Sequence, residues 1–351
     1  MKTAIILFNL GGPDGPDAVR PFLFNLFNDP AIIGLPQPLR WIVAQLIAGR
    51  RAPTARKIYA HMGGRSPIVA ETEAQARALE AALGSDFRCF IAMRYWRPRA
   101  REQLASVKAW GADRILLLPL YPQFSTTTTA SSMREWQLEA TAAGLDLPTT
   151  TLCCYPTNAG FIAAVAAGVQ VGLAQLSADQ PDQRPRVLFS AHGLPKKVID
   201  AGDPYQAQVE QSVAAVLARL AHLEEAGPAF DWVTCYQSRV GPLEWIGPST
   251  EAEVIRGGAD GVPLVVVPIA FVSEHSETLV ELDVEYRALA REKGVPAYVR
   301  VPTVSADRAF IAGLADEVRR AIASDRRVRS SEGPRICASD RSGCPCDKGS
   351  N

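Results

Sequence analysis

The feature that most constrains the fold is an alternation of short apolar runs with longer amphipathic stretches, repeated in both halves of the chain. Apolar, β-branched runs such as residues 263–271 are typical of strands buried on both faces of a parallel sheet. Strands that alternate with helices predict right-handed βαβ units. The expected strands are residues 3–10, 87–95, 114–121 and 149–154 in the first half, and 187–190, 230–236, 263–271 and 296–301 in the second.

The chain is therefore expected to be an α/β protein of two doubly wound, Rossmann-like lobes. Each lobe should hold a four-stranded parallel sheet flanked by helices, with a cleft between the lobes. The predicted N-terminal lobe is residues 1–156, the C-terminal lobe is 157–323, and a cysteine-containing tail is 324–351. Because the tail has almost no apolar content, it should be disordered unless a covalent or metal anchor holds it.

Composition narrows the classes of function. The formal net charge is zero, from 37 basic and 37 acidic residues, so no global field favours nucleic acid as a partner. The first apolar run is broken by Gly11 and Gly12 too early for a signal peptide, and no run approaches the roughly 20 residues of a membrane span. Seven cysteines in a chain this long do not resemble a secreted disulfide framework, so the cytoplasm is expected.

Residues 268–286 carry a dense group of ionisable side chains, with His275 and Glu277 just after a predicted buried strand. Glu277, Glu281 and Glu285 are four residues apart, so an α-helix would stack them on one face. Such a row is either a solvated helix face or a path for cations and protons. The second interpretation is favoured because open α/β folds bind ligands at the carboxyl ends of their strands.

A second histidine has the same setting, since His192 directly follows the predicted strand at 187–190. Two histidines at equivalent strand ends, one beside a glutamate, indicate a site rather than two structural residues. Trp245 lies in a loop with Gly and Pro, where it either packs ordinarily or stacks on a flat ligand. The chain has no Gly-rich phosphate-binding motif, which disfavours nucleotide binding.

The tail holds three cysteines, Cys337, Cys344 and Cys346, in a polar segment that offers no hydrophobic reason for them. Zinc is the generic explanation, whereas a fourth thiolate would complete an iron–sulfur cluster. Cys153 and Cys154 end a predicted strand and are candidates for the fourth ligand. The spacing alone does not choose between the two metals.

Eight motifs, occurring in family order over nearly the whole chain, resemble those of ferrochelatases. This resemblance implies the two-lobed fold and insertion of Fe²⁺ into protoporphyrin IX, the last step of haem synthesis. The motifs are NLGGP (9–13), GGRSPI (63–68), MRYWRP (93–98), LPLYPQFS (118–125), SAHGLP (190–195), GDPY (202–205), QSRVGPLEW (237–245) and FVSEHSETLVELDVEY (271–286).

The resemblance also implies roles for individual residues. His192 is the central residue, as proton acceptor or metal ligand, with Glu277 facing it across the macrocycle and His275 supporting that glutamate. Neutral histidine can accept a pyrrole proton, and carboxylates can relay protons or bind a hard cation. The remaining implied residues are Glu281, Asp283 and Glu285 as an acidic, metal-binding conduit, Arg94 and Tyr95 as a pocket wall, and Leu10, Ser190 and Trp245 as substrate contacts.

Two further implications concern partners and cofactors. The apolar stripe within residues 39–47 matches a family lip that dips into the cytoplasmic membrane face, although the spacing suits a core helix equally well. The tail cysteines resemble the bacterial 2Fe–2S pattern, with Cys154 or Cys153 as the internal ligand. Strand alternation points these two side chains to opposite faces, so only one should bind.

Two alternative functions and the oligomeric state remain open. A related chelatase would act on coproporphyrin III, but the apolar Leu10 and the apolar lip favour protoporphyrin. A non-catalytic tetrapyrrole or metal carrier would share the two-lobed fold without the chemistry. The sequence also leaves a homodimer open.

Overall fold

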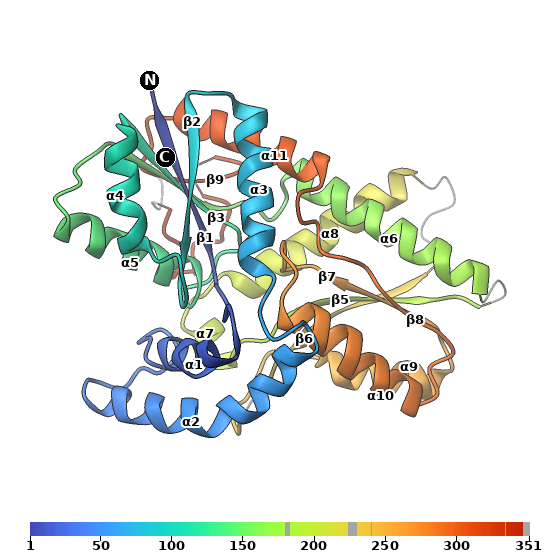
Figure 1. The fold of residues 1–351 in the computed structure, drawn as a ribbon. Helices are drawn as coiled ribbons and strands as arrows, with labels where there is room; N and C mark the ends of the chain where they lie inside the picture. The colour runs from blue at the N-terminus through green and yellow to red at the C-terminus, as the bar shows by residue number, and fades with distance from the viewer. Residues whose placement is uncertain (180–182, 224–229, 240, 334, 347–351) are drawn as a thin grey trace. The chain divides into compact units, whose positions relative to one another are not determined.

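The computed structural model describes residues 1–179, 183–223, 230–239, 241–333 and 335–346. The chain divides into two compact units, each built around one parallel sheet (Figure 1). The first unit comprises Met1–Cys154, Ala315–Ile336 and Pro345–Asn351. The second comprises Tyr155–Leu314 and Cys337–Cys344. The α/β class and the parallel sheets predicted from the alternation are confirmed.

The first sheet has the order β2-β1-β3-β4-β9, with every neighbouring pair parallel. All seven residues of the central strand β1 are buried, so this strand forms the middle of the unit's core. The strands are β1 (Thr3–Asn9), β2 (Phe87–Met93), β3 (Arg114–Pro119), β4 (Thr149–Cys154) and β9 (Val328–Ser330).

The prediction of four strands in this sheet is wrong because the tail adds a fifth. Strand β9 pairs with β4, and the backbone N–H of Thr151 donates to the carbonyl of Arg327 at 2.7 Å. Backbone hydrogen bonds form a ladder without apolar side chains, so the polar composition of the tail gave no signal of this strand.

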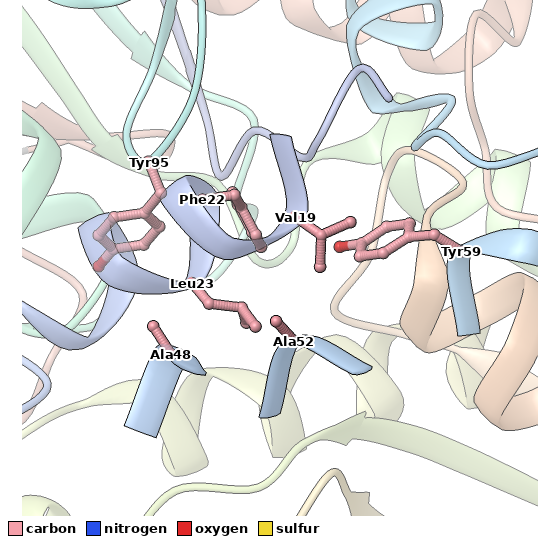
Figure 2. Close-up of a cluster of buried hydrophobic side chains, with 7 residues drawn as sticks. All are labelled: Val19, Phe22, Leu23, Ala48, Ala52, Tyr59 and Tyr95. Atoms are coloured by element: carbon pink, nitrogen blue, oxygen red, sulfur yellow. The ribbon is translucent and has the colours of Figure 1, made fainter. Parts of the chain in front are cut away.

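The helices of the first unit are α1 (Val19–Phe27), α2 (Leu39–Ala60), α3 (Ile68–Leu83), α4 (Ala100–Trp110) and α5 (Thr129–Ala142), preceded by a short 3₁₀ turn at Pro16–Ala18. Helices α1 and α2 pack on each other through a buried cluster that includes Phe22, Leu23 and Ala52 (Figure 2). Helix α2 continues through Pro53, well past the apolar stripe at 39–47, because Ala52 and Tyr59 still pack in this cluster.

The second sheet has the predicted four strands, in the order β6-β5-β7-β8. Its strands are β5 (Arg186–His192), β6 (Asp231–Gln237), β7 (Leu264–Pro268) and β8 (Tyr298–Arg300). The register pairs His192 with Gln237 and Ser190 with Pro268. The carboxyl ends of β5, β6 and β7 therefore meet at one edge of the sheet. The helices of this unit are α6 (Ala159–Asp179), α7 (Lys196–Asp200), α8 (Tyr205–Leu223), α9 (Thr250–Asp260) and α10 (Arg287–Glu292). Helix α11 (Arg308–Ile322) begins in the second unit and continues into the first, to which residues from Ala315 belong.

Helix α6 is long and apolar enough to cross a membrane by length and composition alone, over Ala159–Ala178, with a mean hydropathy of 1.7 and 39% of the window buried. The sequence prediction that no apolar run approaches this length is therefore wrong. Close packing on the second sheet also accounts for the apolar character of this helix. A Cβ on Gly168 would lie 2.5 Å from Val301, and one on Gly172 would lie 2.9 Å from Val265. A helix that lies this close to a sheet needs small and apolar residues on the facing side.

The helix after β7 is the main local departure from the sequence prediction. Residues Glu277–Tyr286 form a π-helix, which continues as α10. A π-helix hydrogen-bonds five residues apart, so side chains four residues apart no longer form one row as they do in an α-helix. The predicted stacking of Glu277, Glu281 and Glu285 on one face is therefore not the geometry observed.

Candidate functional site

The centre of the candidate site is a contact between His192 at the end of β5 and Glu277 at the start of the π-helix. Nδ1 of His192 lies 2.8 Å from Oε2 of Glu277. The His192 side chain is 38% exposed and that of Glu277 is 23% exposed, so the pair is accessible from solvent. The structure thus brings together the two residues that the sequence singled out. Because they are in direct contact, the expected placement of Glu277 across the macrocycle from His192 is not the geometry observed.

The two groups shift each other's protonation. Burial of the His192 ring opposes its charged form, but the charge of Glu277 and the hydrogen bond to it prevail and raise the pKa of His192. Burial also opposes ionisation of Glu277, yet His192, His275 and Ser238 together lower the pKa of Glu277 to about 2. The pair therefore favours a charged histidine beside a carboxylate, with a proton held between two accessible groups.

Glu281 lies one step further along the helix and accepts hydrogen bonds from uncharged donors. The backbone N–H of Ser238 donates to its Oε1 at 2.7 Å, and Ser238 Oγ lies 2.5 Å from its Oε2. Gln237 Nε2 and the Tyr286 hydroxyl donate at 3.1 Å each. Burial and the charge of Glu277 raise the pKa of Glu281 despite the Ser238 and Gln237 donors, so the two neighbouring carboxyls have pKa values shifted in opposite directions.

His275 supports the site from inside. Its side chain is buried, its Nδ1 lies 3.0 Å from the Ser273 carbonyl oxygen, and its ring packs on Phe271 with centroids 4.9 Å apart. Thr278 Oγ1 accepts a hydrogen bond from the His275 backbone N–H at 3.0 Å. These contacts give His275 a supporting position relative to Glu277.

Asp283 and Glu285 lie apart from this group. Asp283 is paired with Arg300, whose Nη2 lies 2.6 Å away, and with Arg287 at 3.0 Å. Glu285 is exposed. Arg300 is itself buried and also binds Glu274 at 2.6 Å, so it ties the segment before the π-helix to the helix itself.

Ser190 and Trp245 lie near His192 in the same unit. Ser190 is fully buried, and its hydroxyl donates to Gln237 Oε1 at 2.8 Å and lies 2.7 Å from Thr250 Oγ1. Trp245 is half-buried and its ring lies 3.5 Å from where a Cβ on Gly193 would be. Its Nε1 is buried without a hydrogen-bond partner in the structure. Ser190 is thus placed to orient Gln237, and Trp245 covers the backbone next to His192.

The remaining predicted substrate residues belong to the first unit. Tyr95 is buried, and its hydroxyl donates to Asp29 Oδ2 at 2.8 Å, while Arg94 Nη2 lies 2.7 Å from the same oxygen. Ser131 donates to that oxygen as well, at 2.6 Å. Leu10 packs against the cluster of Figure 2. Arg94 and Tyr95 therefore hold Asp29, a residue that the sequence analysis did not identify.

The cysteines fall into both units. Within the first unit, Cys153 Sγ lies 3.4 Å from Cys154 Sγ and 3.4 Å from Cys346 Sγ. The expectation that strand alternation points the Cys153 and Cys154 side chains to opposite faces is therefore wrong, because β4 is irregular here and its register with β9 shifts between Leu152 and Cys154. Within the second, Gln208 Nε2 donates to Cys337 Sγ at 3.2 Å, and Cys344 is buried. Cys346 is thus in contact with Cys153, whereas Cys337 is half-buried. Over the described residues, however, no group of three or more His, Cys, Asp and Glu side chains is spaced to hold a metal ion.

Sequence reasoning missed the residues that orient this site. Gln237 and Ser238 were noticed only as part of a motif, and Arg300 was not noticed at all. A signal existed for the first two, because β6 ends there in the same register as His192. Arg300 gave no local signal, since its partners Glu274 and Asp283 lie 26 and 17 residues away in the chain.

Comparison with known proteins supports the resemblance to ferrochelatases that the sequence motifs indicated. A family model described as ferrochelatase matches residues 2–322. The ferrochelatase of Phenylobacterium zucineum (strain HLK1) is 54% identical, covering 99% of each chain. That of Caulobacter vibrioides (strain NA1000 / CB15N) is 52% identical, covering 100% of this chain and 99% of its own.

Solved structures share the fold. SirB from Bacillus subtilis with Fe³⁺ superposes with a TM-score of 0.51 at 14% identity, covering 92% of this chain and 96% of its own. The sirohydrochlorin chelatase SirB from Bacillus subtilis subspecies spizizenii, in complex with cobalt, gives 0.52 at 12% identity, with 92% and 95% covered. With the family model and the close relatives spanning nearly the whole sequence, the chain belongs to the ferrochelatase family and is a lyase that inserts iron into a porphyrin in haem biosynthesis.

Proposed function

We propose that the porphyrin is protoporphyrin IX and that the product is protohaem. Leu10, in the turn after β1, is apolar and packs with other apolar side chains, which suits a ring with few carboxylates. A porphyrin with more carboxylates would call for polar contacts at this turn. The test is to compare kcat/KM with protoporphyrin IX and with coproporphyrin III. A clear preference for coproporphyrin would contradict the proposal.

We propose that His192 and Glu277 carry the chemistry. Metallation requires the ring to lose two pyrrole protons and gain a dication, so the site needs a proton acceptor and negative charge. The observation that carries this proposal is the 2.8 Å contact between His192 Nδ1 and Glu277 Oε2, because it leaves Nε2 as the ring atom that can meet the substrate. In its neutral form His192 acts as acceptor or as metal ligand through Nε2, Glu277 balances the positive charge that results, and Glu281 takes the proton or cation onward.

The rival of a non-catalytic carrier makes a different prediction. A carrier would bind porphyrin and metal without depending on His192 for metallation. The accessible histidine–carboxylate pair, with pKa values displaced on both partners, favours catalysis, because such displaced groups concentrate at active sites.

We propose that the exposed face of helix α2 contacts a membrane surface and makes the enzyme peripherally associated with the cytoplasmic face. Leu39 is 55% exposed, Ile42 47% and Leu46 69%, while the buried face of the helix consists of alanines and Tyr59. The apolar stripe is therefore not a core face. An exposed apolar helix face suits insertion at the lipid boundary. Replacing Leu46 with Glu should reduce co-sedimentation with vesicles of bacterial lipids, and unchanged binding would contradict the proposal.

We propose that Cys337, Cys344, Cys346 and one internal cysteine hold a 2Fe–2S cluster. The 3.4 Å approach of Cys346 to Cys153 favours Cys153 over Cys154 as the internal ligand. The cluster, when bound, would supply a redox-active iron centre. The purified protein should absorb in the visible and lose this absorption in Cys344→Ser and Cys153→Ser. A colourless protein with one bound zinc would contradict the proposal.

A further inference from the structure

Ser238, the residue directly after β6, has a backbone conformation that is unfavourable for its residue type. Its φ is +61°, in the left-handed region. Residues other than glycine rarely adopt this region because Cβ then crowds the backbone, and such conformations concentrate at functional sites. The surrounding structure must therefore hold Ser238 in place for a reason.

This conformation directs two donors of one residue toward the same carboxylate. The backbone N–H of Ser238 reaches Glu281 Oε1 at 2.7 Å, and its hydroxyl oxygen lies 2.5 Å from Oε2 of the same group. The hydroxyl oxygen also lies 3.2 Å from Glu277 Oε2. Ser238 thus contacts both carboxylates through one atom, and that atom sets how close they lie.

The other contacts of these carboxylates do not duplicate this link. Gln237 donates to the Glu281 side chain at 3.1 Å but reaches Glu277 only at its backbone carbonyl, at 2.9 Å. Tyr286 contacts Glu281 and His192 contacts Glu277. Of these partners, only Ser238 joins the two side-chain carboxylates.

We propose that Ser238 is a positioning residue that fixes the spacing of the Glu277 and Glu281 carboxylates and thereby their ability to receive iron. The inference rests on the roles of these glutamates given under Proposed function. It assigns the left-handed turn a purpose, because a right-handed backbone at this position would turn the N–H and the hydroxyl away from one shared carboxylate. Residues that orient metal-handling groups in this way contribute about 10-fold to 100-fold to activity or metal affinity.

Three substitutions separate positioning from general stability. Ser238→Gly removes the hydroxyl but relieves the backbone, so the unfolding midpoint should rise by about 2 °C while kcat/KM for Fe²⁺ falls at least about tenfold. Ser238→Ala should lose the same activity without the gain in midpoint. Ser238→Thr keeps a hydroxyl in a more strained backbone, so it should retain most activity and unfold at lower temperature. In all three variants, quenching of protoporphyrin fluorescence on binding should match the unaltered enzyme.

A matched control is Ser305→Gly, since Ser305 is the other non-glycine residue with positive φ among the described residues, at +43°. This variant should also unfold at higher temperature and should keep its metallation rate. Unchanged kcat/KM for Fe²⁺ in Ser238→Gly, or a loss in Ser238→Thr equal to that in Ser238→Gly, would overturn the inference. Failure of the proposed function is distinguished by Glu277→Gln, which would then retain activity whatever Ser238 does.

Discussion

The π-helix after β7 carries acidic side chains whose partners differ from one side of the helix to the other. Glu277 and Glu281 are bound by an imidazole, hydroxyls, an amide and a backbone N–H. Asp283, and Glu274 just before the helix, are bound by the buried guanidinium of Arg300. The Glu277 side chain is partly accessible to solvent, whereas Glu274 and Asp283 contact Arg300 at the end of β8.

This difference separates two uses of the same residue type. A carboxylate held by Arg300 is fixed in place, because the guanidinium keeps its charge at any ordinary pH. A carboxylate held by neutral donors and a histidine can exchange a proton or accept a cation without leaving a buried charge unpaired. The helix thus combines a structural side and a side suited to chemistry, and acidic spacing in the sequence did not distinguish them.

The largest effect is expected on the Glu277 side. Glu277→Gln removes the negative charge that balances His192 but keeps the side chain's size. Metallation should fall by about 100-fold to 10,000-fold. The urea midpoint of unfolding should change little at a pH above the raised pKa of His192, where the pair no longer adds to stability and Gln can still accept the hydrogen bond from Ser238. An activity loss that merely parallels a loss of folded protein would remove the distinction between the two sides.

Arg300→Ala, by contrast, should lower the stability of the folded protein. The Arg300 side chain is only 8% exposed, so its removal leaves Glu274 and Asp283 without their shared cation. Breaking a buried ion pair from one side costs about 3–5 kcal/mol, which urea unfolding can measure. Arg319→Ala is a suitable control, because Arg319 pairs with Asp316 at the surface and should change stability by less than about 1 kcal/mol.

His192, which contacts Glu277, should titrate above its ordinary range. Burial lowers the pKa of His192 but Glu277 raises it more, so the net pKa lies above 6.5. The pair then stabilises folding most between pH 4.5 and 6.5, and this contribution is lost as pH rises through the raised pKa of His192 or falls toward 2. An NMR titration of the His192 ring should show a raised pKa that drops below 6.5 in Glu277→Gln. A pKa unmoved by that substitution would refute the coupling.

The smallest effect is expected at Glu285, which belongs to neither group of bound carboxylates. Its side chain is exposed and lies outside the hydrogen-bonded group of Glu277 and Glu281. Glu285→Gln should therefore change kcat/KM for Fe²⁺ by less than about twofold and stability by less than about 0.5 kcal/mol. A loss comparable to that of Glu281→Gln would instead restore the conduit along all three glutamates that the sequence suggested.

The sequence was sufficient for what depends on local pattern. Apolar runs located the strands, and two strand-end histidines located the site, because the carboxyl ends of parallel strands meet at one edge. It was insufficient where long-range contacts decide. The π-helix displaced Glu281 from Glu285, Arg300 reached its partners across many residues, and β9 joined the first sheet through backbone groups alone. Ser238 was overlooked because its position depends on a positive φ angle, which the identity of the residue does not predict.

The central claim is that metallation depends on the accessible pair at the end of β5. The most direct measurement is the initial rate of Fe²⁺ insertion into protoporphyrin IX by His192→Ala, at a concentration of folded protein matched by circular dichroism. The account predicts near-complete loss of insertion with porphyrin binding retained. A rate equal to that of the unaltered enzyme would contradict it and would favour a carrier in which this histidine has no chemical role.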